Sequence, residues 1–198
     1  MKRVILLLAA MAATMVVASG VALAVTKIGT NGPDVLRGTN GADNLIGLGG
    51  NDVLTGLGGR DNLIGGPGKD VVFGFLGGDK NLVGGPGNDR VGGGKGSDRV
   101  VGGEGNDFLS GDPGAGGPWR DIMSGGAGTD VFFAANRPGS KDIVLCGGGV
   151  DWVFADRKDV IAPNCERVAD RDSEFERLFF SIPESFFEGL PPIPPGVL

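Results

Sequence analysis

The chain has 198 residues and a formal charge of −6, and 40 of its residues are glycine. It contains no histidine, which excludes Ser-His-Asp and Cys-His nucleophilic catalysis and histidine-ligated zinc sites. The acidic balance disfavours binding to nucleic acid and to anionic membranes, and it favours binding of cations.

Residues 1–24 have the pattern of a secretory signal peptide. Lys2 and Arg3 form a positive start, an apolar run follows, and Ala22-Leu23-Ala24 matches the small-x-small cleavage pattern. The sequence therefore predicts a secreted, extracellular chain that begins at Val25 and has no stable membrane insertion after cleavage. The alternative is an uncleaved anchor, because the apolar run is nearly long enough to span a bilayer.

Between residues 29 and 109 an aspartate recurs every nine residues, with one extra residue near Lys80. Glycines stand five and two positions before each aspartate, and an apolar residue stands two positions after most of them. A fixed period of this kind determines the whole fold, because each unit buries its apolar side chain only by stacking on other units. The early units are looser, since Thr30, Thr39, Leu48 and Leu57 replace the second glycine.

The best units follow the pattern Gly-Gly-x-Gly-x-Asp-x-apolar over residues 65–73, 84–91 and 102–110. This nonapeptide resembles the hemolysin-type (RTX) calcium-binding repeat family. The resemblance implies an all-β, right-handed parallel β-roll with two nonapeptides per turn, so that alternate aspartates stack on the same side. The core would consist of two facing columns of Leu and Val. We expect the extra residue near Lys80 to shift the alternation locally.

Stacked units place aspartates about 4.8 Å apart, where two carboxylates repel by about 0.8 kcal/mol even in bulk water. Calcium accepts six to eight oxygen ligands in flexible geometry, whereas magnesium requires a stricter octahedron. We therefore predict Ca²⁺ as the cofactor, with the best sites centred on Asp70, Asp89, Asp98 and Asp107. A metal-free solenoid with aspartates that only cap turns is the alternative. The predicted ligands are Asp34, Asp43, Asp52, Asp61, Asp70, Asp79, Asp89, Asp98, Asp107, Asp130, Gly65, Gly68, Gly84, Gly87, Gly93, Gly96, Gly102 and Gly105.

Residues 110–151 contain degraded copies, which we expect to serve closure of the roll more than metal binding. We assign the repeats to residues 25–154, a C-terminal cap to 155–170 and a tail to 171–198. The segments 146–149 and 164–168 look like the close of secreted actinobacterial-type members of the family. Cys146 and Cys165 are then predicted to form a disulfide, with two free thiols as the alternative.

The tail, residues 171–198, no longer follows the nine-residue repeat. Phe175, Leu178, Phe179 and Ile182 recur at helical spacing, which indicates a short amphipathic helix before a proline-rich end. We expect a flexible or short-helical tail that covers the exposed edge of the last turn; a partner-binding segment is the alternative.

The sequence thus predicts a secreted, monomeric calcium-binding protein with a structural or surface-interaction role and no enzymatic activity. A calcium-dependent enzyme acting on polysaccharide is one alternative, although no carboxylate pair stands apart from the repeat. An adhesin that contacts cell surfaces or polysaccharide is the other. An ice-binding solenoid would require a flat row of identical outward side chains, which the sequence does not show.

Overall fold

The computed structural model describes residues 22–112, 117–135, 140–170 and 181–192. The predicted signal peptide therefore lies outside the described residues except for residues 22–24. Residues 175–179 of the predicted tail helix also lie outside them. Within the described part of the chain, no helix has the length and apolar character needed to cross a membrane.

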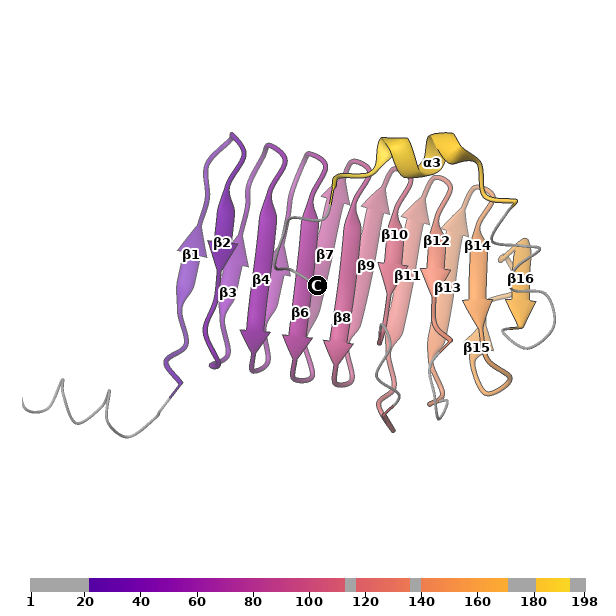
Figure 1. Ribbon diagram of the computed structural model, residues 1–198, viewed down its shortest axis with the longest axis horizontal. Coiled ribbons are helices and arrows are strands. Elements are labelled where there is room, and N and C mark those ends of the chain that lie inside the picture. Colours follow the sequence, from indigo (N-terminus) through magenta and orange to yellow (C-terminus); the bar gives the residue numbers. More distant parts are fainter. Residues whose placement is uncertain (1–21, 113–116, 136–139, 171–180, 193–198) are drawn as a thin grey trace, which may run out of the picture.

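The chain forms a flattened parallel β-solenoid in which successive strands alternate between two eight-stranded sheets (Figure 1). Sheet A contains β1 (Thr26–Ile28), β3 (Asn44–Ile46), β5 (Asn62–Ile64), β7 (Asn81–Pro86), β9 (Arg99–Glu104), β11 (Ile122–Ala127), β13 (Ile143–Gly148) and β15 (Val160–Ile161). Sheet B contains β2 (Val35–Arg37), β4 (Val53–Gly58), β6 (Val71–Leu76), β8 (Arg90–Lys95), β10 (Phe108–Ser110), β12 (Val131–Phe133), β14 (Trp152–Ala155) and β16 (Arg167–Asp170). The prediction of an all-β parallel roll is confirmed.

The core lies between the two sheets and contains the apolar residue of each unit. The strands pair in register, so that Leu45 lies beside Leu63 and Leu54 beside Val72. Each unit therefore stacks its apolar side chain on its equivalent one coil away, as the period predicts. The two facing columns are Leu45, Leu63, Leu82, Val100, Met123 and Val144 from sheet A, and Leu36, Leu54, Val72, Val91, Leu109, Phe132 and Val153 from sheet B.

The extra residue near Lys80 does not shift the alternation, and that prediction is wrong. β6 pairs directly with β8, with Val72 beside Val91, and Asp79 still stacks on Asp98. Lys80 follows the aspartate and is exposed, and its backbone N–H donates to the carbonyl of Asp61 at 3.0 Å. The extra residue is accommodated in the turn before β7 begins, so the strands keep their register.

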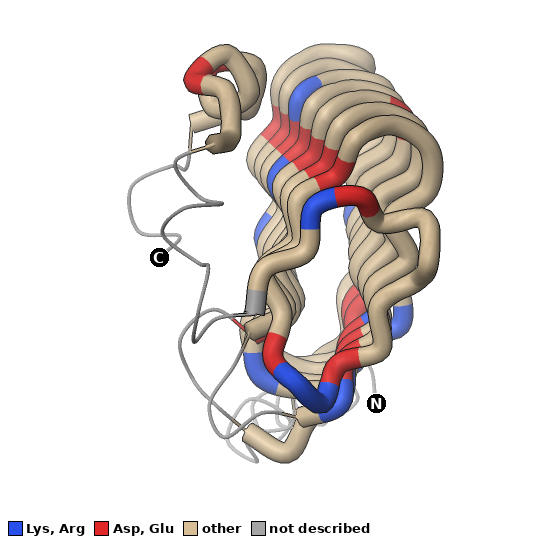
Figure 2. Tube along the Cα trace, turned by 90° about the vertical axis from the view of Figure 1, so that its right-hand side faces the viewer, with Lys and Arg blue, Asp and Glu red and all other residues tan. Residues whose placement is uncertain are grey.

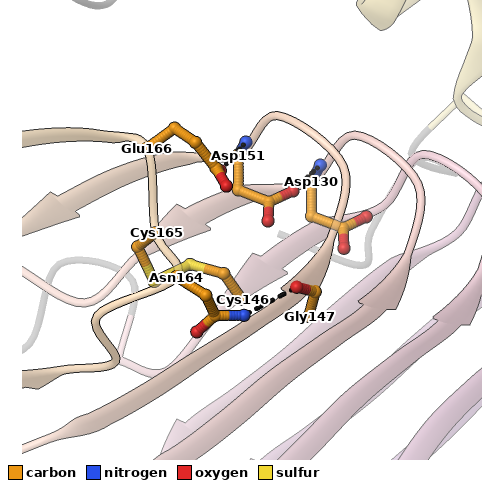
Figure 3. The surroundings of a disulfide bond; sticks show 7 residues. All are labelled: Asp130, Cys146, Gly147, Asp151, Asn164, Cys165 and Glu166. Atoms are coloured by element: carbon orange, nitrogen blue, oxygen red, sulfur yellow. Dashed lines mark hydrogen bonds between the residues drawn. A yellow bond between two sulfur atoms is a disulfide. The ribbon is translucent and has the colours of Figure 1, made fainter.

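The C-terminal end of the roll is closed by a covalent bond. Cys146 on β13 and Cys165 form a disulfide with a Cα–Cα distance of 5.4 Å, as predicted. Asn164 beside it donates from Nδ2 to the carbonyl of Gly147 at 2.6 Å (Figure 3). Residues 155–170, expected as a cap, include β15 and β16, which extend both sheets by one further strand.

The described part of the tail packs against outward side chains near the upper ends of the sheet B strands, rather than on the edge of the last turn (Figure 1). Its helix α3 (Glu184–Gly189) buries Phe186 in a cluster with Trp152 and Phe154. Arg90 on β8 donates from Nε to the carbonyl of Pro191 at 2.6 Å. The reason is the aromatic character of this face, where the rings of Phe133 and Phe154 stack at 4.8 Å and require cover from water.

The assigned core predicts different effects on stability for two leucine substitutions, one in the core and one on the surface. Leu82 is fully buried, whereas Leu76 is 53% exposed. Leu82→Ala is expected to lower the free energy of unfolding by about 2–5 kcal/mol, because it removes core packing and leaves a cavity. Leu76→Ala is expected to change it by less than about 0.5 kcal/mol. Urea unfolding in saturating calcium measures both, and equal effects would contradict the assigned core.

Candidate metal centre

The aspartates form two ladders, one along each turn edge of the roll (Figure 2). Ladder 1 contains Asp34, Asp52, Asp70, Asp89, Asp107, Asp130 and Asp151 and ends at Glu166. Ladder 2 contains Asp43, Asp61, Asp79, Asp98, Asp121, Asp142 and Asp159. Alternate aspartates therefore stack on the same side, as the resemblance to the repeat family implies.

Within each ladder, one carboxylate oxygen has a fixed structural partner. The Oδ1 atom of an aspartate accepts a hydrogen bond from the backbone N–H of the aspartate one coil earlier. Asp52 N donates to Asp70 Oδ1 at 2.7 Å, and Asp70 N donates to Asp89 Oδ1 at 2.8 Å. The aspartate is thus required for stacking itself, apart from any metal, because it satisfies a backbone donor in the turn.

The other carboxylate oxygen has no such partner in the middle of either ladder. Oδ2 is buried without a hydrogen bond in ten ladder aspartates, namely Asp52, Asp61, Asp70, Asp79, Asp89, Asp98, Asp107, Asp121, Asp130 and Asp151. Buried polar atoms normally have a partner, because leaving one unpaired costs the free energy of its lost hydration. A repeated series of unpartnered oxygens therefore indicates a missing positive group.

The glycine at the start of each unit brings backbone oxygen close to these carboxylates. A methyl group placed on Gly65 would collide with the carboxylate of Asp70 and would lie 2.7 Å from the carbonyl oxygen of Gly84. The glycines at the second and fourth positions of the unit have left-handed backbone, as at Gly66 (φ 113°) and Gly68 (φ 154°). Leu48 and Leu57 keep this conformation with φ of 82° and 78°, so their looser units still form the same turn.

These oxygens suit calcium, although the carboxylates alone do not complete a site. In the described ranges, no group of three or more His, Cys, Asp or Glu side chains is placed to hold one metal ion. Each site must therefore combine Asp Oδ2 with backbone carbonyl oxygens of the glycine-rich turns. Calcium binds such mixed sets of carboxylate and carbonyl oxygens.

The two N-terminal aspartates differ from the rest because the protein itself supplies their donors. Thr30 donates to Asp34 Oδ2 from its backbone N–H at 2.6 Å and from its hydroxyl at 2.9 Å. Thr39 donates its N–H to Asp43 Oδ2 at 2.6 Å. Asp34 and Asp43 were predicted as ligands together with the others, but the structure provides their Oδ2 atoms with protein partners.

The C-terminal end of ladder 2 is closed in a similar way. Asp159 Oδ2 accepts the N–H of Asp156 at 2.8 Å, and the hydroxyl of Ser140 donates to Asp142 at 3.1 Å. In ladder 1, Glu166 takes the place of an aspartate and accepts the N–H of Asp151 through Oε2 (Figure 3). Ladder 2 therefore ends in a carboxylate whose Oδ2 has a protein donor, whereas in ladder 1 the unpartnered oxygens continue to Asp151.

Asp121 and Asp151 belong to the unpartnered set but were not among the predicted ligands. Both side chains are fully buried. The insertion after Ser110 breaks the nine-residue count before Asp121, so a search by spacing does not reach it. Gly111 and Met123 are the remaining signal, since they keep the glycine and apolar slots of that unit. The expectation that later units serve closure more than metal binding therefore does not fit the burial of these two carboxylates.

Burial is the main cause of raised pKa values along the ladders. It raises the pKa of Asp70 to about 6, of Asp89 and Asp107 to about 7, and of Asp121 and Asp130 to about 8. The backbone hydrogen bond from the preceding aspartate opposes this shift, and neighbouring carboxylates add to it. Without a cation, several ladder carboxylates are therefore protonated near neutral pH.

These pKa shifts predict an inverted pH dependence for the metal-free protein. Since the folded pKa values exceed the unfolded value near 3.8, the folded state binds more protons between about pH 4 and 8. Stability should fall as pH rises through that range. Thermal melting of calcium-depleted protein is expected to give a higher Tm at pH 5 than at pH 8. Calcium should remove most of the difference by stabilising the ionised form, and a calcium-free Tm that rises with pH would contradict the burial of the carboxylates.

The crowding around the first glycine of each unit predicts different effects on stability for two glycine-to-alanine substitutions. Gly65→Ala is expected to lower the free energy of unfolding by more than about 1 kcal/mol, because the new methyl group displaces the Asp70 carboxylate. Gly148 has open space around it and no left-handed backbone, so Gly148→Ala should change stability by less than about 0.5 kcal/mol. Denaturant unfolding of both variants tests this, and a tolerated Gly65→Ala would refute the crowding at the turn.

Comparison with known proteins agrees with this geometry. No curated protein and no solved structure matches the chain. The family model of the RTX calcium-binding nonapeptide repeat matches in four copies, over residues 28–63, 55–80, 83–118 and 115–136. These matches cover more than half of the sequence and most of the unpartnered aspartates. The chain therefore belongs to the RTX calcium-binding nonapeptide repeat family, whose repeats bind Ca²⁺.

Proposed function

We propose that this protein is a secreted, non-enzymatic calcium-binding β-roll whose cations hold successive coils together. The observation that carries the proposal is the set of buried, unpartnered Oδ2 atoms from Asp52 to Asp151. Bound calcium would supply the positive charge that these atoms lack. The protein's role is then structural or surface-directed, with a fold that depends on the calcium concentration outside the cell.

The ladders also define which turns take part. An ion held between two successive aspartates of a ladder requires an unpartnered Oδ2 on both of them. Ladder 1 has five such intervals between successive aspartates, and ladder 2 has three. We assign the ligands to Asp52, Asp61, Asp70, Asp79, Asp89, Asp98, Asp107, Asp121, Asp130 and Asp151, together with turn carbonyls including those of Gly65, Gly68, Gly84, Gly87, Gly93, Gly96, Gly102 and Gly105. Asp34 and Asp43 stay outside this set because threonine donors satisfy them.

Secretion rests on the signal-peptide pattern of residues 1–24, and Val25, the expected start of the mature chain, lies at the start of ladder 2. The backbone nitrogen of Val25 donates to Asp43 Oδ1 at 2.6 Å. After cleavage behind Ala24, this nitrogen would be the terminal ammonium group, and it would pair with a carboxylate that has no access to calcium in our assignment. N-terminal sequencing of the exported protein tests the cleavage position.

Calcium removal is the direct test of the proposed function. Circular dichroism and thermal melting in millimolar calcium are expected to show the full β-structure, with a Tm well above that measured in excess EGTA at pH 7.5. Magnesium at the same concentration should restore little of the difference, because its octahedral geometry fits carbonyl-rich turns poorly. Identical spectra and melts in calcium and EGTA would overturn the proposal.

A further inference from the structure

Asp112 is a buried carboxylate that the repeat does not require. It follows Gly111 and occupies the second position of its unit, where most units have glycine or an apolar residue. Only 6% of its surface is exposed, and neither of its carboxylate oxygens has a hydrogen-bond partner. Among the described residues it is the one carboxylate for which both oxygens are buried in this state.

The backbone places Asp112 beside ladder 2, between the coils of Asp98 and Asp121. A methyl group on Gly93 would lie 2.6 Å from Asp98 Oδ2 and 2.9 Å from the carbonyl oxygen of Gly111. A methyl group on Gly111 would in turn collide with Asp121 Oδ2. The unpartnered oxygens of Asp98 and Asp121 therefore lie on either side of the backbone that carries Asp112.

The charged groups that act on Asp112 are mostly negative. Asp98 and Asp142 disfavour its ionised form, after the larger effect of burial, and Lys95 is the one cation that favours it. Lys95 makes no hydrogen bond to either carboxylate oxygen, since both are unpartnered. This part of ladder 2 therefore carries one more carboxylate than any regular interval, without a protein cation in contact.

At the start of the roll, the second position of the unit holds a hydrogen-bond donor instead of a carboxylate. Thr30 and Thr39 also occupy second positions, and each donates hydrogen bonds to the aspartate of its own unit. A carboxylate in that position can donate no hydrogen bond when ionised. Threonine thus closes an aspartate to cations, whereas Asp112 adds two further oxygen acceptors to a turn that already has an unpartnered one.

We propose that Asp112 is the side-chain ligand of an additional kind of divalent-cation site, formed with Asp98 and the carbonyl oxygen of Gly111. The site takes calcium, and it rests on the proposed function, since it lies at a ladder interval. Two carboxylates with backbone carbonyl oxygens agree with the absence of a group of three acidic side chains in the described ranges. This interval carries the carboxylate of Asp112 in addition to those of Asp98 and Asp121, and this extra negative charge makes it bind calcium more tightly than the other intervals.

Isothermal titration with calcium chloride tests the assignment at Asp112. The wild-type isotherm is expected to contain one equivalent that binds roughly tenfold more tightly than the remaining sites. Asp112→Asn should lose this tight equivalent and keep the weaker ones. Glu104→Gln removes one exposed negative charge outside the ladders and serves as the matched control, which should keep the tight equivalent.

The outcomes separate this inference from the proposed function. No calcium binding by the wild-type protein would overturn both. Calcium binding by wild type with an unchanged isotherm for Asp112→Asn would overturn the Asp112 site alone.

Thermal melting of the same variants distinguishes a ligand from a structural residue. Without calcium, Asp112→Asn is expected to raise the Tm, because it removes a buried charge. With calcium, the variant should gain less in Tm than wild type does. If the substitution shifts the Tm equally in calcium and in EGTA, Asp112 has no role in binding and the inference fails.

Discussion

The structure depends on one constraint. Because successive coils repeat the same pattern, each residue lies directly beside the equivalent residue of the next coil. For leucine and valine this gives a continuous core at no electrostatic cost. For aspartate it places like charges beside one another along both turn edges, in surroundings that exclude water. The two oxygens of each carboxylate meet this constraint differently, since Oδ1 accepts a backbone N–H and Oδ2 remains without a protein donor over the middle of the roll.

Variation at the second position of the repeat now has a physical meaning. Threonine at the first two units donates to the carboxylate and removes the need for a cation. Leu48, Leu57 and Phe75 keep the left-handed turn of glycine and leave the carboxylate open. Asp112 adds charge where the others add none. One position in nine thus distinguishes turns whose Oδ2 atom has a protein donor from turns whose Oδ2 atom has none.

Much of this architecture was readable from the sequence, because a strict period determines both the strands and the core. The period predicts stacked units with an apolar core, and the resemblance to the calcium-binding repeat implies the two aspartate ladders, the facing Leu and Val columns and the disulfide. The closed state of Asp34 and Asp43 could not be predicted, since it depends on hydrogen bonds from Thr30 and Thr39. Asp121 was missed because an insertion breaks the count, although stacking depends on register in space rather than on residue number. The position of α3 was missed because outward aromatic side chains have no fixed period.

The contact between Arg90 and Pro191 has a consequence for the order of folding. Ladder bonds join residues 17–23 apart in the chain, except at the last coil, so coils can form one after another with local contacts only. The Arg90 bond spans 101 residues and requires the intervening coils to be in place. Because α3 also buries Phe186 against Trp152 and Phe154, it can dock only on a roll that is already assembled. Docking of α3 therefore depends on the number and register of the coils, since a missing or slipped coil would change the distance between the aromatic face and Arg90.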